Sequence, residues 1–283
     1  MIFSRILPFC TIVICCCSKP DLASIPTFVS IQEVAFEPPA GQERLRNQLI
    51  SEIWIYADSQ LIGAYPVPAI VPILGDELVR LDVYAGIREN GQAASPIVYP
   101  LMNPWSMDIN LNANSRLELT PTFTYGRTIR FALVEDFESG NQFRQDLDGD
   151  TLTGFEISTL HAIEGKSARS VLSTSHPLLE VASNFAYSNL PSNGAPVFLE
   201  LEYASETSLA VGLKTGNGDK LYKLLLFAND LVPQKIYVNF TAEIEAAKTS
   251  DFELIFLSTY DESSGKSEQE VIIDNIKLLH FRT

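Results

Sequence analysis

From residue 27 onward, polar and apolar side chains alternate with a period of two, the pattern of a half-buried β-strand and not of an amphipathic helix. The segment TFVSIQEVAF (27–36) is the first such run. The same alternation continues at short spacing in three further runs, at 78–87, 105–113 and 115–125. About a hundred residues with some seven short strands are typical of an immunoglobulin-like β-sandwich.

The segment EIWIYADSQLIGAY (52–65) contains two β-rich runs on either side of a polar Ala-Asp-Ser-Gln sequence, which predicts a β-hairpin. Three prolines follow closely, at Pro66, Pro68 and Pro72. Proline cannot donate a ladder hydrogen bond, so these positions predict edge or crossover segments and exclude a long central strand.

A second all-β block begins near residue 128. Its eight predicted strands span 129–138, 168–174, 196–204, 208–214, 222–228, 235–242, 251–260 and 269–281. Only TAEIEAAKT (241–249) has a helical pattern, with Thr241 as the expected N-cap. Turn-rich intervals between short strands are typical of a jelly-roll sandwich, and the absence of alternating long helices excludes a Rossmann-type fold.

The fold class predicted is therefore all-β, with an N-terminal Ig-like β-sandwich over 27–127 followed by a C-terminal jelly roll over 128–283. A chain of 283 residues is long enough for two self-sufficient cores. Its formal net charge of −15 argues against nucleic-acid binding, because a phosphate backbone needs a basic surface to neutralise it.

The first residues of the chain have the pattern of a signal peptide. An apolar run of about a dozen residues (6–17) follows Arg5, which is too short to span a membrane and fits the hydrophobic region of a signal peptide. All four cysteines of the chain lie here, at 10, 15, 16 and 17. Adjacent cysteines in an apolar segment, with no histidine nearby, suit a disulfide or zinc site poorly.

Two interpretations stay open, a cleaved ordinary signal peptide and a bacterial lipoprotein signal. ICCC followed by SKPD resembles a lipobox, which implies a signal peptide over 1–16, a lipid on Cys17 and a proline-containing tether over 17–26. Cys16 is the rival lipidation site. Acyl chains on one cysteine would anchor the protein firmly, since each buried methylene contributes about 0.8 kcal/mol.

Four segments together resemble an uncharacterised surface lipoprotein family of the Bacteroidota. They are WIYADSQLIGAYPVPAIVPIL, RLDVYAGIRENGQAASPIVYP, VEDFESG and IIDNIKL. The resemblance implies a lipobox, a tether, an Ig-like domain and a C-terminal jelly roll, with an outer-membrane and cell-surface location. It implies no particular activity.

The C-terminal half also resembles the jelly rolls of carbohydrate-binding modules, in which an early strand, a loop and the last strand build a structural calcium site. The matching positions are Glu138, Gly165, Ser167 and Asp274. Independently, strand alternation would place Asp274 on one inward face with Ile272, Ile276 and Leu278. A buried carboxylate needs a cation or hydrogen-bond donors, so calcium and backbone N–H groups are the two alternatives.

No other segment predicts chemistry. Asp146, Asp148 and Asp150 lack the glycine and glutamate spacing of an EF-hand and suggest a solvated acidic loop. The three histidines are scattered, and no zinc-protease, nucleophile-elbow or phosphate-loop motif occurs. The sequence predicts no enzyme and no catalytic residue.

The expected function is that of a lipid-anchored envelope protein, an interaction or accessory subunit of an outer-membrane assembly with a protein partner there. The alternative is a carbohydrate-binding surface lipoprotein that serves polysaccharide uptake. For that alternative, exposed aromatic side chains would have to stack on sugars, and the tyrosines of the second block are the candidates: Tyr187, Tyr203, Tyr222 and Tyr260.

Overall fold

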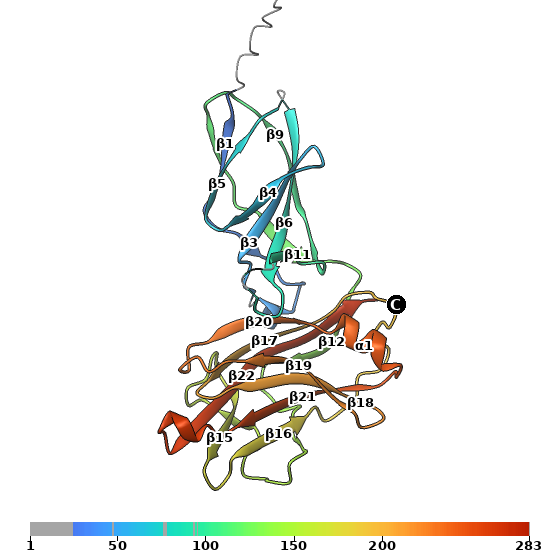
Figure 1. Ribbon diagram of the computed structural model, residues 1–283. Helices are drawn as coiled ribbons and strands as arrows, with labels where there is room; N and C mark the ends of the chain where they lie inside the picture. The colour runs from blue at the N-terminus through green and yellow to red at the C-terminus, as the bar shows by residue number, and fades with distance from the viewer. Residues whose placement is uncertain (1–24, 47, 76–77, 93, 95, 283) are drawn as a thin grey trace, which may run out of the picture.

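The computed structural model describes residues 25–46, 48–75, 78–92, 94 and 96–282. Two β-sandwiches follow one another along the chain, and one end of the first lies on a face of the second (Figure 1). The signal peptide, Cys16, Cys17 and most of the tether lie outside the described residues. Within them, no helix is long and apolar enough to cross a membrane.

The N-terminal sandwich is Ig-like and packs one five-stranded sheet against shorter strands. The larger sheet has the order β4 (Gln60–Pro66), β3 (Glu52–Ala57), β6 (Leu78–Arg88), β7 (Pro96–Val98), and β9 (Trp105–Asn110) also pairs with β6. Facing it are β10 (Arg116–Glu118), β1 (Thr27–Ile31) and β5 (Ala69–Ile73), and a second trio of β2 (Ala35–Phe36), β11 (Thr122–Tyr125) and β8 (Met102–Asn103). A short 3-10 helix, η1 (Glu43–Leu45), precedes β3.

Local sequence signals in this domain are confirmed. β3 and β4 form the predicted hairpin, and Asp58 and Ser59 between them take the positive φ values of 46° and 66° that a tight hairpin turn needs. The proline-containing strands β4 and β5 both lie at the edges of their sheets, where a missing N–H breaks no ladder.

The C-terminal sandwich is a jelly roll of two sheets. One has the order β14 (Glu156–Ser158), β15 (Ser167–Ser173), β22 (Glu268–Phe281), β17 (Val197–Ser205), β20 (Gln234–Asn239), with β12 (Ile129–Glu135) also on β22. The other has the order β13 (Gln145–Asp146), β16 (Leu178–Ala182), β21 (Phe252–Thr259), β18 (Leu209–Thr215), β19 (Lys220–Leu226). A further 3-10 turn, η2 (Glu262–Ser264), precedes β22.

The eight strands predicted for this block are present, whereas the short strands β13, β14 and β16 were not predicted. The helix is present as α1 (Thr241–Ala247), but the expected cap at Thr241 was wrong. Thr241 is the first helical residue, and its hydroxyl accepts the backbone N–H of Val197 at 3.1 Å. The Asn239 side chain instead accepts the Thr241 N–H at 3.0 Å.

The predicted face of the last strand was also wrong. Val271 and Ile273 belong to the jelly-roll core before a bulge, and Ile276 and Leu278 belong to it afterwards. Asn275, with φ at 48°, is the inserted residue that reverses the alternation. At the same point β22 changes neighbour on one side, from β15 to β12, while β17 stays paired along its other side.

The Ig-like domain covers the outer face of the β22, β17 and β20 sheet. Phe198, Tyr237 and Leu279 of the jelly roll belong to the same apolar cluster as the N-terminal core. The rings of Tyr99 and Phe198 pack edge to face, with centroids 5.3 Å apart. The two domains therefore share a continuous hydrophobic interface and do not merely follow one another on a linker.

A buried carboxylate stands at the centre of this interface. Glu200 of β17 is fully buried, and the ammonium groups of Lys277 and Lys235 lie 3.4 and 3.5 Å from it. From the Ig-like domain, Tyr99 donates to it at 2.7 Å and Gln48 at 2.9 Å. Tyr125 donates to both carboxylate oxygens at 3.0 Å.

The three charged groups of this cluster, Glu200, Lys235 and Lys277, all come from the jelly roll, and the Ig-like domain supplies neutral donors to Glu200. Burial alone would raise the pKa of Glu200, but the two lysines and the donated hydrogen bonds outweigh it and hold that pKa below its usual value. Burial lowers the pKa of Lys277 to about 8, against the attraction of Glu200. Burial raises the pKa of Tyr99 and of Tyr125, and the adjacent carboxylate raises both further.

Replacing Glu200 with alanine is expected to lower the free energy of unfolding by about 3–5 kcal/mol, because two buried ammonium groups lose their counter-ion. Denaturant titration of the Glu200→Ala chain measures the loss. Glu118→Ala is the control, since its side chain is 73% exposed. A loss below about 1 kcal/mol would contradict a structural role for the buried carboxylate.

Candidate functional site

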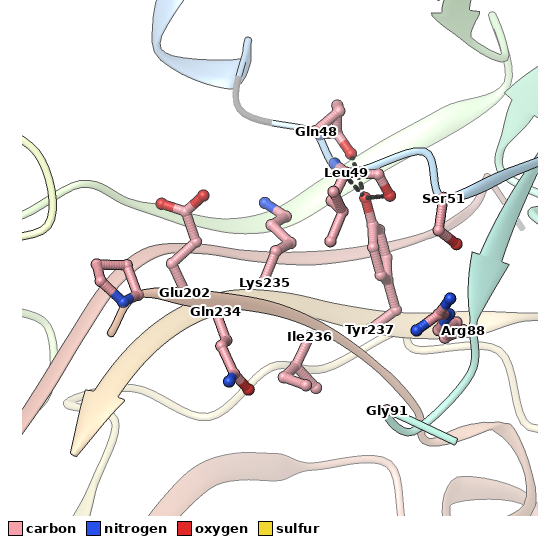
Figure 2. Close-up of a pocket in the computed structure, with 11 residues that line it drawn as sticks. Gln48, Leu49, Ser51, Arg88, Gly91, Glu202, Gln234, Lys235, Ile236 and Tyr237 are labelled. Carbon is pink, nitrogen blue, oxygen red and sulfur yellow. Dashed lines mark hydrogen bonds between the residues drawn. The ribbon is translucent and has the colours of Figure 1, made fainter. Parts of the chain in front are cut away.

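A mixed polar and apolar depression at the domain junction follows β20. Its first part has a volume of about 750 Å³ and is drawn in Figure 2. Gln48, Leu49 and Ser51 line it from the Ig-like domain, as do Arg88 and Gly91 at and just beyond the end of β6. The jelly roll contributes Glu202 of β17 and the segment from Pro233 to Tyr237.

Successive side chains along β20 point to opposite sides of the strand. Lys235 and Tyr237 point toward the Ig-like domain, and Gln234 and Ile236 point to the opposite side (Figure 2). The Tyr237 hydroxyl accepts the Leu49 N–H at 3.0 Å and donates to Gln48 or to the Leu49 carbonyl. Burial raises the pKa of Tyr237, so this hydroxyl keeps its proton.

Backbone pairing fixes the rim of the site. Glu89 forms a parallel bridge with Tyr237, and the Asn90 N–H donates to the Tyr237 carbonyl at 2.8 Å. The Asn90 side chain accepts the Asn239 N–H at 3.0 Å. The end of β6 thus protects the edge strand β20, and the two walls of the site are held at a fixed separation.

A second depression of about 410 Å³ shares Gly91, Gln234 and Ile236 with the first. Its further lining comes from Asn90, Gln92, Tyr203 and the chain from Leu224 to Asn229. We call the two together the junction groove.

The junction groove has an apolar end. Phe227 is 75% exposed and Leu225, which also lines this end, is 53% exposed. Amide groups flank this end, since Gln92 and Gln234 are exposed and both line the groove. An exposed aromatic ring beside amides can stack on an apolar ring face while the amides bond to hydroxyl groups.

None of the four tyrosines suggested from the sequence forms an open aromatic platform. Tyr203 is buried and donates to the Phe227 carbonyl at 3.2 Å. Tyr187 and Tyr260 are half-buried, and the Tyr222 hydroxyl donates to Glu180 at 2.5 Å. Sequence reasoning missed Phe227, because a phenylalanine at the end of an apolar strand resembles a core residue.

The four residues of the predicted calcium site are brought together by the fold. Asp274 lies at the bulge of β22 and Ser167 begins β15, where its hydroxyl donates to the Asp274 carboxylate at 2.7 Å. Glu138 follows β12 and accepts the Lys166 N–H at 2.7 Å. Gly165 has φ at +50°, and a Cβ there would overlap the Glu138 carboxylate.

Hydrogen-bond donors occupy the Asp274 carboxylate from both sides. Besides Ser167, the N–H of Glu164 donates at 3.2 Å and that of Asn275 at 2.7 Å. Two arginines of the Ig-like domain, Arg44 and Arg46, also line the adjoining cavity of about 430 Å³. Among the described residues, no group of three or more His, Cys, Asp or Glu side chains could hold a metal ion.

Four carboxylate side chains, those of Asp136, Glu138, Glu164 and Asp274, line this cavity together with the two arginines, so both oxygens and guanidinium groups face it. The calcium site stays a prediction. In the acidic loop, the Asp146 side chain accepts the backbone N–H groups of Asp148 and Gly149, and the Asp148 side chain accepts that of Asp150. The Asp150 side chain bonds to His176 at 2.7 Å.

The three histidines lie apart. His161 bonds to Glu270 at 2.8 Å and His176 bonds to Asp150. His280 is buried next to the carbonyl of Phe281. The described residues therefore contain no paired histidines.

No protein-family model and no curated protein matches the sequence. Solved structures that the chain resembles include a family 29 carbohydrate-binding module, at 14% identity and a TM-score of 0.34, over 54% of this chain and 86% of that one. Another is the module TmCBM61 in complex with β-1,4-galactotriose, at 13% identity and a TM-score of 0.38, over 53% of this chain and 97% of that one. Similarities with such low identities and TM-scores do not indicate what this protein binds.

The stability of the protein is expected to fall as the pH rises toward 7, because the buried carboxyl group of Asp274 ionises in that range. Burial raises its pKa from 3.8 to about 7, and the hydrogen bonds it accepts oppose that shift only in part. Since the folded state then binds the proton more tightly than the unfolded chain, the stabilisation is present at low pH and is lost as Asp274 ionises. Melting curves at about pH 5.5 and pH 8 should differ less in Asp274→Asn than in the wild type.

Equal pH dependence of the melting temperature in the wild type and in Asp274→Asn would contradict this assignment of the raised pKa.

The same two proteins test for calcium binding. A bound ion requires the ionised carboxylate, so added calcium would raise the melting temperature at the higher pH in the wild type, but not in Asp274→Asn, and a chelator would reverse the rise.

Proposed function

We propose that this protein is a non-catalytic glycan-binding protein of the cell envelope, and that the junction groove is its binding site. The observation that carries the proposal is the 75% exposed ring of Phe227 at the groove's apolar end, next to exposed amides. Leaving a phenylalanine in water is unfavourable, and a ligand with an apolar ring face and a polar edge would use both surfaces. A pyranose sugar has these two surfaces.

The length and polarity of the junction groove support an oligosaccharide more than a single small molecule. Its two parts have volumes of about 750 and 410 Å³, and they share three lining residues. Arg88, Glu202 and Gln234 supply both donors and acceptors along it. Sugar hydroxyl groups need both kinds of partner.

The same lining supports binding without hydrolysis. Glycoside hydrolysis uses a pair of carboxyl groups that flank the scissile bond. Glu202 is the single carboxylate among the described residues that line the junction groove. Its side chain also accepts a hydrogen bond from Asn275 at 2.7 Å, which holds it in a structural contact.

A second candidate function is that of an accessory subunit in an outer-membrane assembly. The docking of one end of the Ig-like domain on a sheet face of the jelly roll favours it, because a stiff body can hold a surface at a set distance from its attachment point (Figure 1). A lipid on Cys17 would provide that attachment in both functions. A structural calcium ion beside Asp274 is proposed only as the alternative to the hydrogen bonds described above.

Glycan binding is expected to depend on Phe227. On a glycan array, Phe227→Ala should lose the signal of whichever oligosaccharide the wild type binds, and calorimetry with that oligosaccharide should show a loss of roughly tenfold in affinity. Phe185→Ala is the matched control, since Phe185 is 70% exposed and does not line the groove. Unchanged binding by Phe227→Ala would overturn the proposal, and co-purification with an outer-membrane protein without any glycan signal would favour the accessory role.

The lipid on Cys17 is tested separately. Mass spectrometry of the mature protein should find an acylated cysteine at its N-terminus, and Cys17→Ser should abolish both the modification and membrane association. Cys16→Ser is the control and should keep both. Loss of the lipid in Cys16→Ser alone would assign it to Cys16, and an unmodified N-terminus at or beyond Ser18 would exclude lipidation.

A further inference from the structure

A second groove at the domain junction is lined by four arginines. Arg44 comes from η1, Arg127 from the connection between the domains, Arg130 from β12, and Arg282 from the end of β22. The groove has a volume of about 900 Å³ and shares no lining residue with the junction groove. We call it the arginine groove.

These arginines differ from most others in the chain because they lack counter-ions. Arg46, Arg80, Arg88, Arg116 and Arg169 each form an ion pair. Among the side chains that the structure describes, none forms an ion pair with Arg44, Arg127, Arg130 or Arg282, and all four are exposed. In a chain with 35 acidic residues, such a concentration of unpaired positive charge is unusual.

The lining of the arginine groove contains few acidic groups, although Arg44 also lines the neighbouring cavity beside Asp274. Glu37, which is exposed, is the one acidic residue among its described lining. Burial lowers the pKa of His280, the neighbour of Phe281 on β22, and the positive charge of Arg130 lowers it further. Four guanidinium groups against one carboxylate leave the described lining of this groove with an excess of positive charge, although the net charge of the chain is −15.

The surface between the arginines is apolar. Pro38 and Pro39 line one side, and Phe131 and Val134 of β12 line the other. Phe131 packs edge to face on Tyr125 with centroids 5.0 Å apart, which ties this wall to both domains. A single inorganic ion would leave most of a 900 Å³ groove empty, whereas a short chain of rings with one negative charge per ring would fill it.

We propose that the arginine groove binds an acidic oligosaccharide, with the carboxylates of its sugar acids on the guanidinium groups and its ring faces on the proline and phenylalanine side chains. The planar guanidinium matches a carboxylate with two parallel hydrogen bonds, which a lysine cannot do. The groove is separate from the site at Phe227, so each can bind or fail to bind without the other.

The test uses the full-length chain in detergent and calorimetric titration with tetragalacturonic acid and with a neutral galactose tetramer. The acidic tetramer is expected to bind, and to bind more weakly when ionic strength rises from about 0.05 to about 0.15 M. Arg130→Gln/Arg282→Gln should weaken it by roughly tenfold or more, since two charge-assisted contacts are lost. Glu37→Gln should tighten it.

Arg80→Gln/Arg116→Gln is the matched control, because it changes the net charge equally, outside the groove, and should leave the affinity unchanged. Phe227→Ala should also keep acidic binding, which separates this site from the junction groove. Absence of binding by tetragalacturonic acid, equal binding by the neutral tetramer, or an equal loss in both double variants would overturn the proposal. Inorganic phosphate that competes at concentrations similar to those of the tetramer would also overturn it, because the site would then recognise a simple anion.

Discussion

The buried carboxylate of Glu200 is the polar contact that joins the two domains. An ionised group without solvent must be neutralised and hydrogen-bonded, and here the neutralising lysines come from the jelly roll whereas the tyrosine and glutamine donors come from the Ig-like domain. Separating the domains would take these donors away. Both grooves at the junction depend on this docking, because each has walls from both domains.

The last strand, β22, positions two further buried side chains, those of Asp274 and Lys277. β22 is the central strand of its sheet. A one-residue bulge at Asn275 divides it into a first part that pairs with β15 and a second part that pairs with β12. The bulge places Asp274 where it accepts three hydrogen bonds, and it sets Lys277 opposite Glu200. A regular strand would have moved Lys277 and Leu279 to the other face.

The strands, the hairpin and the edge prolines could be predicted because they follow from short-range alternation and from the missing N–H of proline. The juxtaposition of Glu138, Gly165, Ser167 and Asp274 was implied by resemblance, and the fold brings these four residues together. The bulge could not be predicted, because IIDNIKL alternates acceptably without it. Phe227 and the four arginines were missed because no local pattern marks a side chain as lining a groove.

The sequence by itself determined an all-β chain with two sandwiches, since alternation is a property of each strand alone. It did not determine what covers the outer face of the jelly-roll sheet. In VFLELEYAS the glutamates alternate with core residues as they would on a solvated face, yet docking of the Ig-like domain buries Glu200 completely. That burial depends on contacts between distant residues, which only the tertiary structure decides. The convergence of four arginines from three separate segments of the chain depends on such contacts too.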